Sequence, residues 1–425
     1  MSTIDDSYDI RRFTPSGTEV NAETRGWLQA ETQGFHSKRY TEASLVRVSE
    51  ALLTDGQTLT GAYPVSRREP SLPAEYPVAT FSSFAKSLNV GGGHLVPAHL
   101  ISAVTVRPTH RRRGLLRRMM TENLAIAAAD GFAIAALTAS EATIYRRFGF
   151  GPAAWTRSVS LATDARFRLL TEPSGTCEQI EALELTDIGP RVFARFHETQ
   201  TGSVDRHVGI WHAITGLVDS DGNEDRSVRA ALHYDTSGTV DGYVSYRVAG
   251  DPLAVDVIDL VAADDNAALG LWQYLASIDL TEKVTWNQAR LDEPLAWALE
   301  NPRLLTVTAE QDWLWLRILN PIAALEARPY SSPGKIVMQI TDPLGHASGT
   351  FRLTVTDAGA HVTRDDAATA DVTLDAWVLG SIYLGGADPL TLGAAGQIIE
   401  HVAGALRTLR RLLSADQPVY GITPF

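Results

Sequence analysis

The sequence of 425 residues is longer than one hydrophobic core usually supports, so we expect two or three domains. With 44% hydrophobic and 20% charged residues, it has the composition of an ordinary globular protein. Its 37 basic and 50 acidic side chains give a formal net charge of −13, which disfavours nucleic acid as a partner.

The single cysteine, Cys177, excludes an intramolecular disulfide, and the sequence offers neither further thiols nor a tight histidine cluster for a structural zinc site. The N-terminus is polar and acidic, without the basic and apolar regions of a signal peptide. The longest apolar stretch, Phe132–Ala139, is too short to cross a hydrocarbon layer of about 30 Å. We therefore predict a cytoplasmic protein that binds no metal and has no membrane anchor.

The first part of the chain, up to about Gly151, predicts elements in the order β, α, α, β, β, β, α, β, α. The early elements are a strand at Tyr8–Phe13, a helix that contains Trp27 and Leu28, a helix at Thr41–Leu53, strands near Leu59–Ala62 and Val78–Ser82, and a Gly91–Gly93 turn before the central strand.

A β-branched run, Val104–Val106, leads into a basic turn that ends at Gly114, and an amphipathic segment with apolar residues at helical spacing follows. Free N–H groups and the positive end of the helix dipole suit a phosphate at such a turn, and glycine lets the backbone approach it closely. The six arginines between Arg107 and Arg118 could instead form a solvated helix face or a local nucleic-acid patch.

A second motif lies downstream, where Tyr145 is followed by Phe148-Gly149-Phe150. Together, the Arg-x-x-Gly turn and the Tyr-x-x-Phe-Gly-Phe run resemble the acetyl-coenzyme-A loop and a later helix of the GNAT acetyltransferases. The resemblance implies that acetyl-CoA binds with its pyrophosphate at the helix N-terminus and its thioester arm along the preceding strand, although Leu116 stands where many members have Gly or Ala. The implied cofactor-binding residues are Val104, Thr105, Val106, Arg111, Arg112, Arg113, Gly114, Leu115, Leu116 and Ser140.

The pattern begins again after Gly151 and gives a second unit. Its elements are strands at Thr156–Leu161, Arg229–Tyr234, Gly242–Val248, Asp256–Val261 and Lys283–Asn287, and helices at Asn266–Ile278 and Pro294–Leu299. In place of the basic turn it has Ala263-Asp264-Asp265-Asn266, whose two carboxylates would repel a pyrophosphate. We interpret this unit as a degenerate copy that binds no cofactor.

A third unit begins near Val307. The segment Trp313–Leu319 leads to a helix at Ile322–Glu326. Strands follow at Lys335–Ile340, Thr350–Thr356 and His361–Arg364, and helices at Asp375–Leu384 and Gly396–Leu413 close the unit. Alternating apolar and polar residues in Thr350–Thr356 predict a half-buried antiparallel strand.

Two GNAT-like units followed by a sterol-carrier-like unit resemble the enhanced intracellular survival acetyltransferases of mycobacteria and their relatives, along nearly the whole chain. The motifs that carry the resemblance are Val106–Arg117, Ala139–Glu141 with Ile144-Tyr145 and Arg147–Gly149, Leu314–Ile318 with Ala323–Arg328, Leu379–Gly385, and the final Phe425. The resemblance implies an α/β (α+β) fold: a catalytic GNAT domain at 1–157, a degenerate GNAT-like domain at 158–306 and a sterol-carrier-like domain at 307–425. It also implies a homo-hexamer.

In that family, the tyrosine matching Tyr145 is the general acid for the departing thiolate, and the carboxylate of the residue matching Phe425 is the base toward the acceptor amine. The chemistry agrees, because an amine attacks a thioester only when it is neutral and when the leaving sulfur receives a proton. From the residues alone, Tyr145 could be a packed helix tyrosine, and Phe425 could end a frayed terminus.

The resemblance implies an N-acetyltransferase that uses acetyl-CoA and acts on a small-molecule or lysine amine, with aminoglycosides as the family's substrates and polyamines as a further class. Trp27, Phe35 and Ala103 are the predicted substrate-binding residues. Ala103 and Pro424 stand where well-known members have an aromatic and an acidic residue, which puts the substrate range in question. The alternative is a non-catalytic protein that binds an apolar ligand or partner through its third unit.

Overall fold

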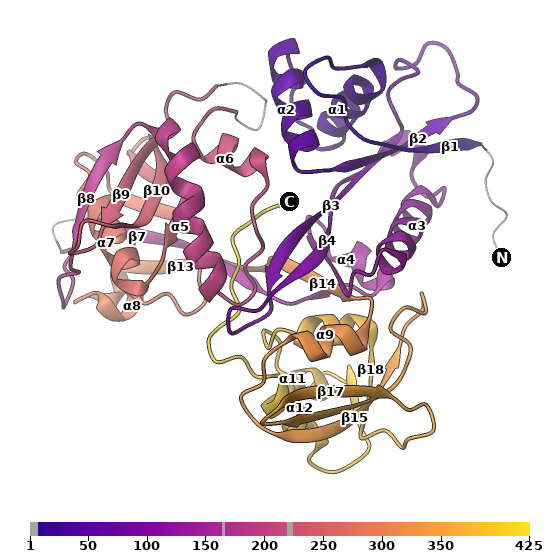
Figure 1. Cartoon of the computed structure of the whole chain (residues 1–425). Helices are drawn as coiled ribbons and strands as arrows, with labels where there is room; N and C mark the ends of the chain where they lie inside the picture. The colour runs from indigo at the N-terminus through magenta and orange to yellow at the C-terminus, as the bar shows by residue number, and fades with distance from the viewer. Residues whose placement is uncertain (1–6, 164–165, 219–223) are drawn as a thin grey trace.

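The computed structural model describes residues 7–163, 166–218 and 224–425. The chain forms three units, each built on its own sheet (Figure 1). In this view the third unit lies below the other two, and the C-terminal segment runs upward between them. No helix within the described ranges is long and apolar enough to cross a membrane.

The first unit has the element order that the sequence predicts, β, α, α, β, β, β, α, β, α. Its strands, in the sheet order β1-β2-β3-β4-β5-β14-β6, are β1 (Tyr8–Phe13), β2 (Thr58–Pro64), β3 (Ala79–Asn89), β4 (Leu95–Val106), β5 (Ile134–Thr138), β14 (Leu314–Ile318) and β6 (Gly151–Pro152). Its helices are α1 (Ala22–Gly34), α2 (Glu42–Thr54), α3 (Leu115–Ala129) and α4 (Ala142–Tyr145). The side chains of Asn21 and Thr41 accept hydrogen bonds from amides in the first turns of α1 and α2, which fixes where both helices begin.

The second unit repeats this plan around another seven-stranded sheet. In the sheet order β13-β7-β12-β11-β10-β9-β8, the strands are β13 (Leu305–Asp312), β7 (Trp155–Ala162), β12 (Lys283–Ala289), β11 (Ala254–Ala262), β10 (Val240–Ala249), β9 (Arg229–Tyr234) and β8 (Thr176–Ile180). Its helices are α5 (Leu185–Thr199), α6 (Val208–Ile214), α7 (Asp265–Ala276) and α8 (Leu295–Ala298). The sequence analysis missed α5 and α6, and Pro190 inside α5 weakened the helical signal there.

The third unit has a five-stranded sheet with helices packed on it. In the order β17-β16-β15-β18-β19, the strands are β17 (Gly359–Arg364), β16 (Gly349–Thr356), β15 (Gly334–Thr341), β18 (Val372–Asp375) and β19 (Ile398–Glu400), and the helices are α9 (Pro321–Ala327), α10 (Ala376–Ile382), α11 (Pro389–Ala394) and α12 (Ala405–Leu413). The predicted helix at Gly396–Leu413 is wrong in its first half. There the chain forms β19, and α12 begins only after Gly404, whose φ of +89° interrupts the helical path.

Residues 307–318, which the sequence analysis placed in the third domain, are paired in the other two sheets. Strand β13 pairs with β7 of the second unit, and β14 inserts between β5 and β6 of the first unit. Every residue of β14 is buried, as expected for a strand with neighbours on both edges and packing on both faces. The chain therefore returns to the first unit after completing the second.

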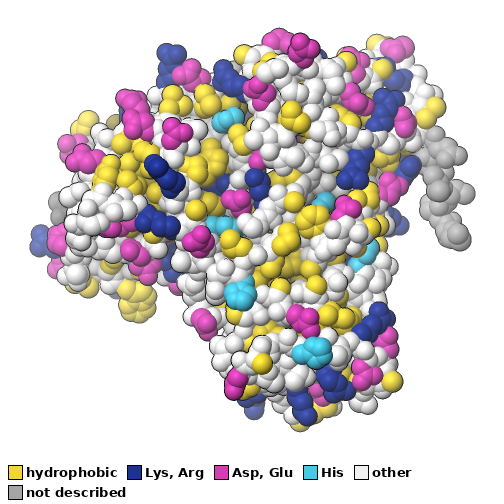
Figure 2. All heavy atoms as spheres, viewed as in Figure 1, with side chains coloured by type: hydrophobic (Ala, Val, Ile, Leu, Met, Phe, Trp, Pro, Cys, Tyr) yellow, Lys and Arg dark blue, Asp and Glu magenta, His cyan; other side chains and the backbone are white. Residues whose placement is uncertain are grey.

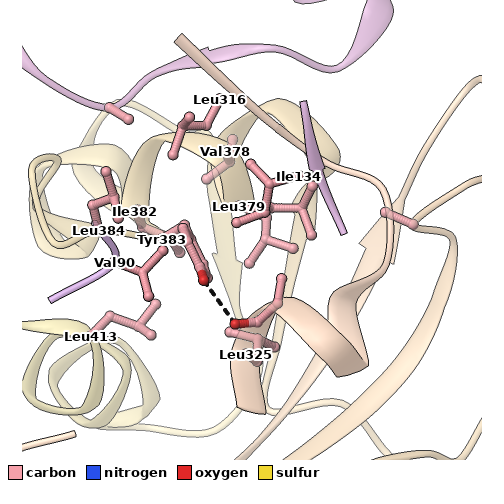
Figure 3. Close-up of a cluster of buried hydrophobic side chains, with 14 of the residues drawn as sticks. Val90, Ile134, Leu316, Leu325, Val378, Leu379, Ile382, Tyr383, Leu384 and Leu413 are labelled. Carbon is pink, nitrogen blue, oxygen red and sulfur yellow. Dashed lines mark hydrogen bonds between the residues drawn. The ribbon is translucent and has the colours of Figure 1, made fainter. Parts of the chain in front are cut away.

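A continuous core joins the first and third units (Figure 3). Tyr383 lies at its centre and donates a hydrogen bond of 2.8 Å from its hydroxyl to the carbonyl of Ala324. On the surface, hydrophobic side chains gather in the middle of the view in Figure 2, where these two units meet. The labelled side chains of the core are Val90, Ile134 and Leu316 from the first unit, and Leu325, Val378, Leu379, Ile382, Tyr383, Leu384 and Leu413 from the third.

A buried ion pair reinforces this junction. Arg317 on β14 and Asp342, just after β15, are both fully buried, and an Arg317 Nη2 to Asp342 Oδ2 distance of 2.5 Å joins them. Burial alone would raise the pKa of Asp342, but Arg317 and the amides of Ala347 and Leu344 hold it below its usual value. The guanidinium also explains Gly149, where φ is +84° and a Cβ would lie 2.7 Å from the Arg317 side chain.

We expect Arg317→Met to lower the free energy of unfolding by about 3–5 kcal/mol, because it leaves the Asp342 carboxylate buried without its counter-ion. The matched control is Arg352→Met. The Arg352–Asp365 pair has a separation of 3.3 Å and both side chains are 42% exposed, so its loss should cost about 0–1 kcal/mol. Urea unfolding followed by circular dichroism measures both. Equal effects of the two substitutions would contradict a structural role for the buried pair.

Candidate functional site

Strands β4 and β5 separate along their length and leave a gap at their carboxyl ends. They are paired in parallel at only two positions, His99 with Ala135 and Leu100 with Ala136. Beyond these, β5 remains paired with β14 on its other edge as far as Thr138. The gap therefore opens on one side of β5 only, and it exposes backbone groups of both strands that have no partner across it.

A bulge in β4 accounts for the separation. Thr80 pairs with Thr105 but Ser82 pairs with Ser102, so β4 has one extra residue between these positions. Ala103, within the bulge, has a φ of +52°, and its carbonyl accepts a hydrogen bond of 2.8 Å from the hydroxyl of Thr80. A bulge of this kind bends its strand and ends regular pairing.

A cavity of about 490 Å³ lies over the gap, and we call it the catalytic cavity. It combines residues from both separated strands with residues from α1, from α6 and its N-terminal flank, and from the end of the chain. Its lining residues are Glu31, Phe35, Ile101, Ser102, Ala103, Val104, Leu137, Thr138, Ala139, Ser140, Tyr145, His207, Ile210, Trp313, Pro424 and Phe425.

The predicted basic turn lies between β4 and α3, as the sequence indicates. Gly114 is the N-cap of α3 and has a φ of +78°, so no side chain caps the first amides of this helix. The space beside its Cα is open, because a Cβ at this position would meet no atom within 4 Å. Arg111, Arg112 and Arg113 are exposed around it, and Arg113 donates a 2.9 Å hydrogen bond to the hydroxyl of Tyr8. Uncapped amides, open space and positive charge together fit a phosphate group.

The other residues predicted to bind the cofactor lie on both sides of this turn. Val104 lines the catalytic cavity, and the hydroxyl of Thr105 lies 2.7 Å from that of Thr80. Val106 is partly buried at the end of β4. Leu115 and Leu116 start α3 and pack on the core of the first unit, where Leu115 is buried and Leu116 is partly buried.

Tyr145 lies at the end of α4 and lines the catalytic cavity with only 5% of its surface exposed. Its ring packs edge-to-face on Phe150, with 6.3 Å between the ring centres. Burial raises the pKa of the Tyr145 phenol, the charge of Glu141 raises it further, and a hydrogen bond with Ser140 partly offsets both. The phenol is therefore protonated at neutral pH and can donate its proton.

Phe425, the last residue of the sequence, is held in the same cavity. Its amide donates a 3.2 Å hydrogen bond to the Thr138 hydroxyl, and that hydroxyl lies 2.5 Å from the Phe425 main-chain oxygen. Its ring meets Phe84 edge-to-face at 6.5 Å. One residue earlier, the Pro424 carbonyl lies 3.2 Å from His207 Nε2, and burial lowers the pKa of that histidine, so its neutral form donates this bond.

The segment that leads to Phe425 is ordered by burial and hydrogen bonds rather than frayed. Val419, Tyr420 and Ile422 are buried in the cores of the units they pass. The Tyr420 amide donates a 2.9 Å hydrogen bond to the carbonyl of Thr201, and the Thr423 hydroxyl donates one of 2.6 Å to the carbonyl of Val204. These contacts fix the end of the chain to the connection between α5 and α6.

Two of the three predicted substrate-binding residues, Phe35 and Ala103, line the catalytic cavity. Trp27 does not. It lines an adjoining second cavity of about 380 Å³ and donates a 2.8 Å hydrogen bond from its indole to the carbonyl of Thr60. The two cavities share Glu31, Ser102, Ala103 and His207 as lining residues.

Sequence reasoning missed three polar residues of this site. Glu31 lies one helical turn after the buried Trp27, and an acidic residue on that face of α1 was a usable signal. Thr138 is the first polar residue after the apolar run of β5, at the end of a strand where ligand groups often lie. His207 is brought to the site by the packing of the second unit against the first, and its sequence context gives no indication of this.

The corresponding place in the second unit has a carboxylate where the first unit has its basic turn. There the side chain of Asp264 caps α7 by accepting a 2.9 Å hydrogen bond from the amide of Ala267. The nearby cavity is also lined by Asp265 and by Glu293, whose pKa burial raises to about 7, and in part by Tyr420 of the C-terminal segment. Among the described residues, no group of three or more histidine, cysteine or acidic side chains could hold a metal ion.

Comparison with family models identifies two GNAT domains and a sterol carrier domain in this chain order. Two models described as an acetyltransferase (GNAT) domain match residues 21–153 and 202–318, and a model described as a sterol carrier protein domain matches residues 322–421. The GNAT fold implies acetyl-CoA as acyl donor.

Similar proteins extend along most of the chain. An uncharacterized N-acetyltransferase of Streptomyces griseus is 36% identical over 415 residues, which cover 95% of this chain and 96% of the relative. N-acetyltransferase Eis of Mycobacterium tuberculosis is 35% identical over 343 residues, 78% of this chain and 82% of the relative. The crystal structure of Eis1 from Mycobacterium abscessus superimposes with a TM-score of 0.80 at 27% identity and covers 98% of this chain and 100% of its own.

Glu31 has an unusual environment that can be tested through stability. Burial raises the pKa of Glu31 from its ordinary value of 4.5 to about 7. Between these two pH values only the unfolded chain ionises at this position, so the wild-type protein loses stability as the pH rises, and the loss is complete above about pH 7.

We therefore expect Glu31→Gln to stabilise the protein by about 1–3 kcal/mol above pH 7 and to have no effect below pH 4.5. Urea unfolding at several pH values measures the difference. Glu50→Gln is the control, because Glu50 is exposed on the neighbouring helix α2. A stability difference for Glu31→Gln that does not change with pH would show that the carboxyl group is not desolvated.

Proposed function

The chain belongs to the Eis family of GNAT N-acetyltransferases, and on this basis we propose that it transfers the acetyl group of acetyl-CoA to an amine of a cationic acceptor in the catalytic cavity. The observation that carries the proposal is the convergence of three features on one cavity: the gap between β4 and β5, the phenol of Tyr145, and the end of the chain at Phe425. The proposal also includes a cytoplasmic homo-hexamer, as the family resemblance implies.

The donor fits the first unit. The uncapped amides at Gly114 and the arginines around it suit the pyrophosphate, and the unpaired edge of β4 from Ile101 to Val106 suits the amide-bearing arm of coenzyme A. Bound acetyl-CoA supplies an activated thioester. The second unit suits a phosphate less well, because the carboxylate of Asp264 caps the amide of Ala267 and places a negative charge at the N-terminus of α7.

Two groups of the cavity then have matching roles in proton transfer. The acceptor amine loses a proton as its nitrogen bonds to the acetyl carbon, and the main-chain carboxylate of Phe425 is the group we assign to take that proton. The carbon–sulfur bond breaks, and the leaving sulfur takes the phenolic proton of Tyr145. The raised pKa of Tyr145 keeps that proton in place until the sulfur becomes basic enough to accept it.

An α-carboxylate with an ordinary pKa near 3.5 is a weak base in water, so its surroundings must assist it. Phe84 covers the ring of Phe425 on one side, and His207 in its neutral form brings no positive charge that would weaken the base. The Thr138 hydroxyl fixes the position of the main chain through two contacts. These features supply orientation and partial desolvation, which favour proton abstraction.

We expect Tyr145→Phe to lower kcat by about 10²-fold and to leave the affinity for acetyl-CoA nearly unchanged, because the hydroxyl acts in the transition state. Thiol release measures kcat, and calorimetry measures the affinity. Tyr330→Phe is the control, since the Tyr330 hydroxyl donates a 2.7 Å hydrogen bond to the carbonyl of Leu325 in the third unit. An unchanged kcat would remove Tyr145 from the role of acid.

Deletion of Phe425, or addition of residues after it, should cut kcat/KM by on the order of 10²-fold while circular dichroism and acetyl-CoA affinity stay the same. Either change displaces the carboxylate by about 3.3–3.6 Å or more, beyond hydrogen-bond reach of its original target. Phe425→Leu separates the two parts of the residue, because it keeps the carboxylate and removes the ring. Full activity of the shortened and extended chains would place the base elsewhere.

A further inference from the structure

The second cavity is mostly apolar, and nothing in the catalytic role just proposed uses it. It lies between α1, α2 and α6, next to the catalytic cavity. Its apolar lining residues are Trp27, Leu28, Val48, Ala51, Leu52, Phe84, Ala103, Ala213 and Val218, and its polar ones are Glu31, Tyr40, Asp55, Gln57, Ser102, His207, Gly209 and His212.

Three polar side chains of this cavity, those of Asp55, Gln57 and His207, have partners within the protein. Asp55 pairs with Lys86 at 2.9 Å and accepts a 2.8 Å hydrogen bond from the amide of Val208. Gln57 accepts a 2.6 Å hydrogen bond from the hydroxyl of Ser82. These groups are satisfied within the protein and do not demand a ligand.

Tyr40, His207 and His212 line the cavity, but none of them supplies a positive charge at pH 7 that could neutralise a carboxylate there. Burial lowers the pKa values of both His207 and His212, so both imidazoles are neutral at pH 7. Burial also raises the pKa of Tyr40, which therefore stays protonated. Asp55 is already neutralised by Lys86.

Glu31 differs from Asp55, the other acidic residue that lines this cavity. Its carboxyl group has no hydrogen-bond or ion-pair partner among the described residues, and burial is the only cause of its raised pKa of about 7. It lines both cavities, and so stands where they meet. A desolvated carboxylate without a counter-ion gains most from a cation that enters the cavity.

We propose that the acceptor is an amphipathic amine, whose ammonium group pairs with Glu31 as it enters the catalytic cavity and whose apolar group fills the second cavity. This inference rests on the proposed acetyl transfer and narrows the acceptor class. A hydrophilic polycation would need several free carboxylates and would leave the walls formed by Trp27, Leu52 and Phe84 without apolar contact. The cavity offers one free carboxylate and an apolar wall.

The test compares amines that share the reacting group and differ in the rest. n-Butylamine and 4-phenylbutylamine differ only by a phenyl ring, and spermidine and kanamycin represent hydrophilic polycations. Thiol release with saturating acetyl-CoA gives kcat and KM for each. We expect the phenylbutyl amine to have a KM lower by on the order of tenfold or more than n-butylamine, with similar kcat, and to exceed both polycations in kcat/KM.

Two substitutions locate the effect. With the phenylbutyl amine as acceptor, Glu31→Gln should raise KM by on the order of tenfold with little change in kcat, because it removes the charge and keeps the shape. Ala213→Trp should make the KM values of 4-phenylbutylamine and n-butylamine equal. Ala213 is exposed on α6 and lines the second cavity, so a larger side chain there fills the space that the phenyl ring would occupy. The controls are Glu50→Gln and Ala43→Trp, which are exposed positions on α2 outside the cavity lining.

Equal KM values for the butyl and phenylbutyl amines, or the highest kcat/KM for a polycation, would overturn the inference. A fall in kcat rather than a rise in KM for Glu31→Gln would also overturn it and make Glu31 a base instead. Calorimetric binding of the phenylbutyl and butyl amines to the full chain with coenzyme A separates the two proposals. Preferential binding of the phenyl amine that needs Glu31, without any acetyl transfer, would contradict the proposed function and support the subsite.

Discussion

The structure depends on how β5 pairs with its two neighbouring strands, β4 and β14. After Ala136, β5 stays paired with β14 but no longer pairs with β4. The bulge at Ala103 bends β4 away from β5. This single separation creates the gap, places the backbone of both strands along it, and leaves Thr138 free to bind the end of the chain. Because β14 lies beyond the second unit in the sequence, β5 gains this partner only when the chain has returned to the first unit.

The local parts of this arrangement could be predicted from sequence because their signals are local. The Arg-x-x-Gly turn, the strand before it and the helix after it follow from composition and periodicity over a short window. The requirement for glycine in the Phe148-Gly149-Phe150 run has a physical reason that the sequence could not give, namely the Arg317 guanidinium against the Cα of Gly149. The predicted helix at Gly396–Leu413 was too long because the helical spacing of its apolar residues was given more weight than the turn signal of Gly404.

The contributions that come from distant parts of the chain could not be predicted from pattern. Glu31, His207 and Phe425 lie on three different segments, and only the docking of the units brings them to shared cavities. The insertion of β14 was hidden for the same reason, since a buried apolar strand does not reveal which sheet it joins. The expectation for Phe425 came from family resemblance, and the structure adds Thr138 as a contact of Phe425 and His207 as a contact of Pro424.

The course of residues 416–425 has a consequence for how the catalytic cavity is completed. Residues 416–425 follow the third unit in the chain, yet they pass along the second unit at Tyr420 and end in the first at Phe425. The catalytic cavity therefore gains the wall formed by Pro424 and Phe425 only when this segment has docked on the other two units. A molecule in which the segment is undocked would keep its first unit and lack that wall.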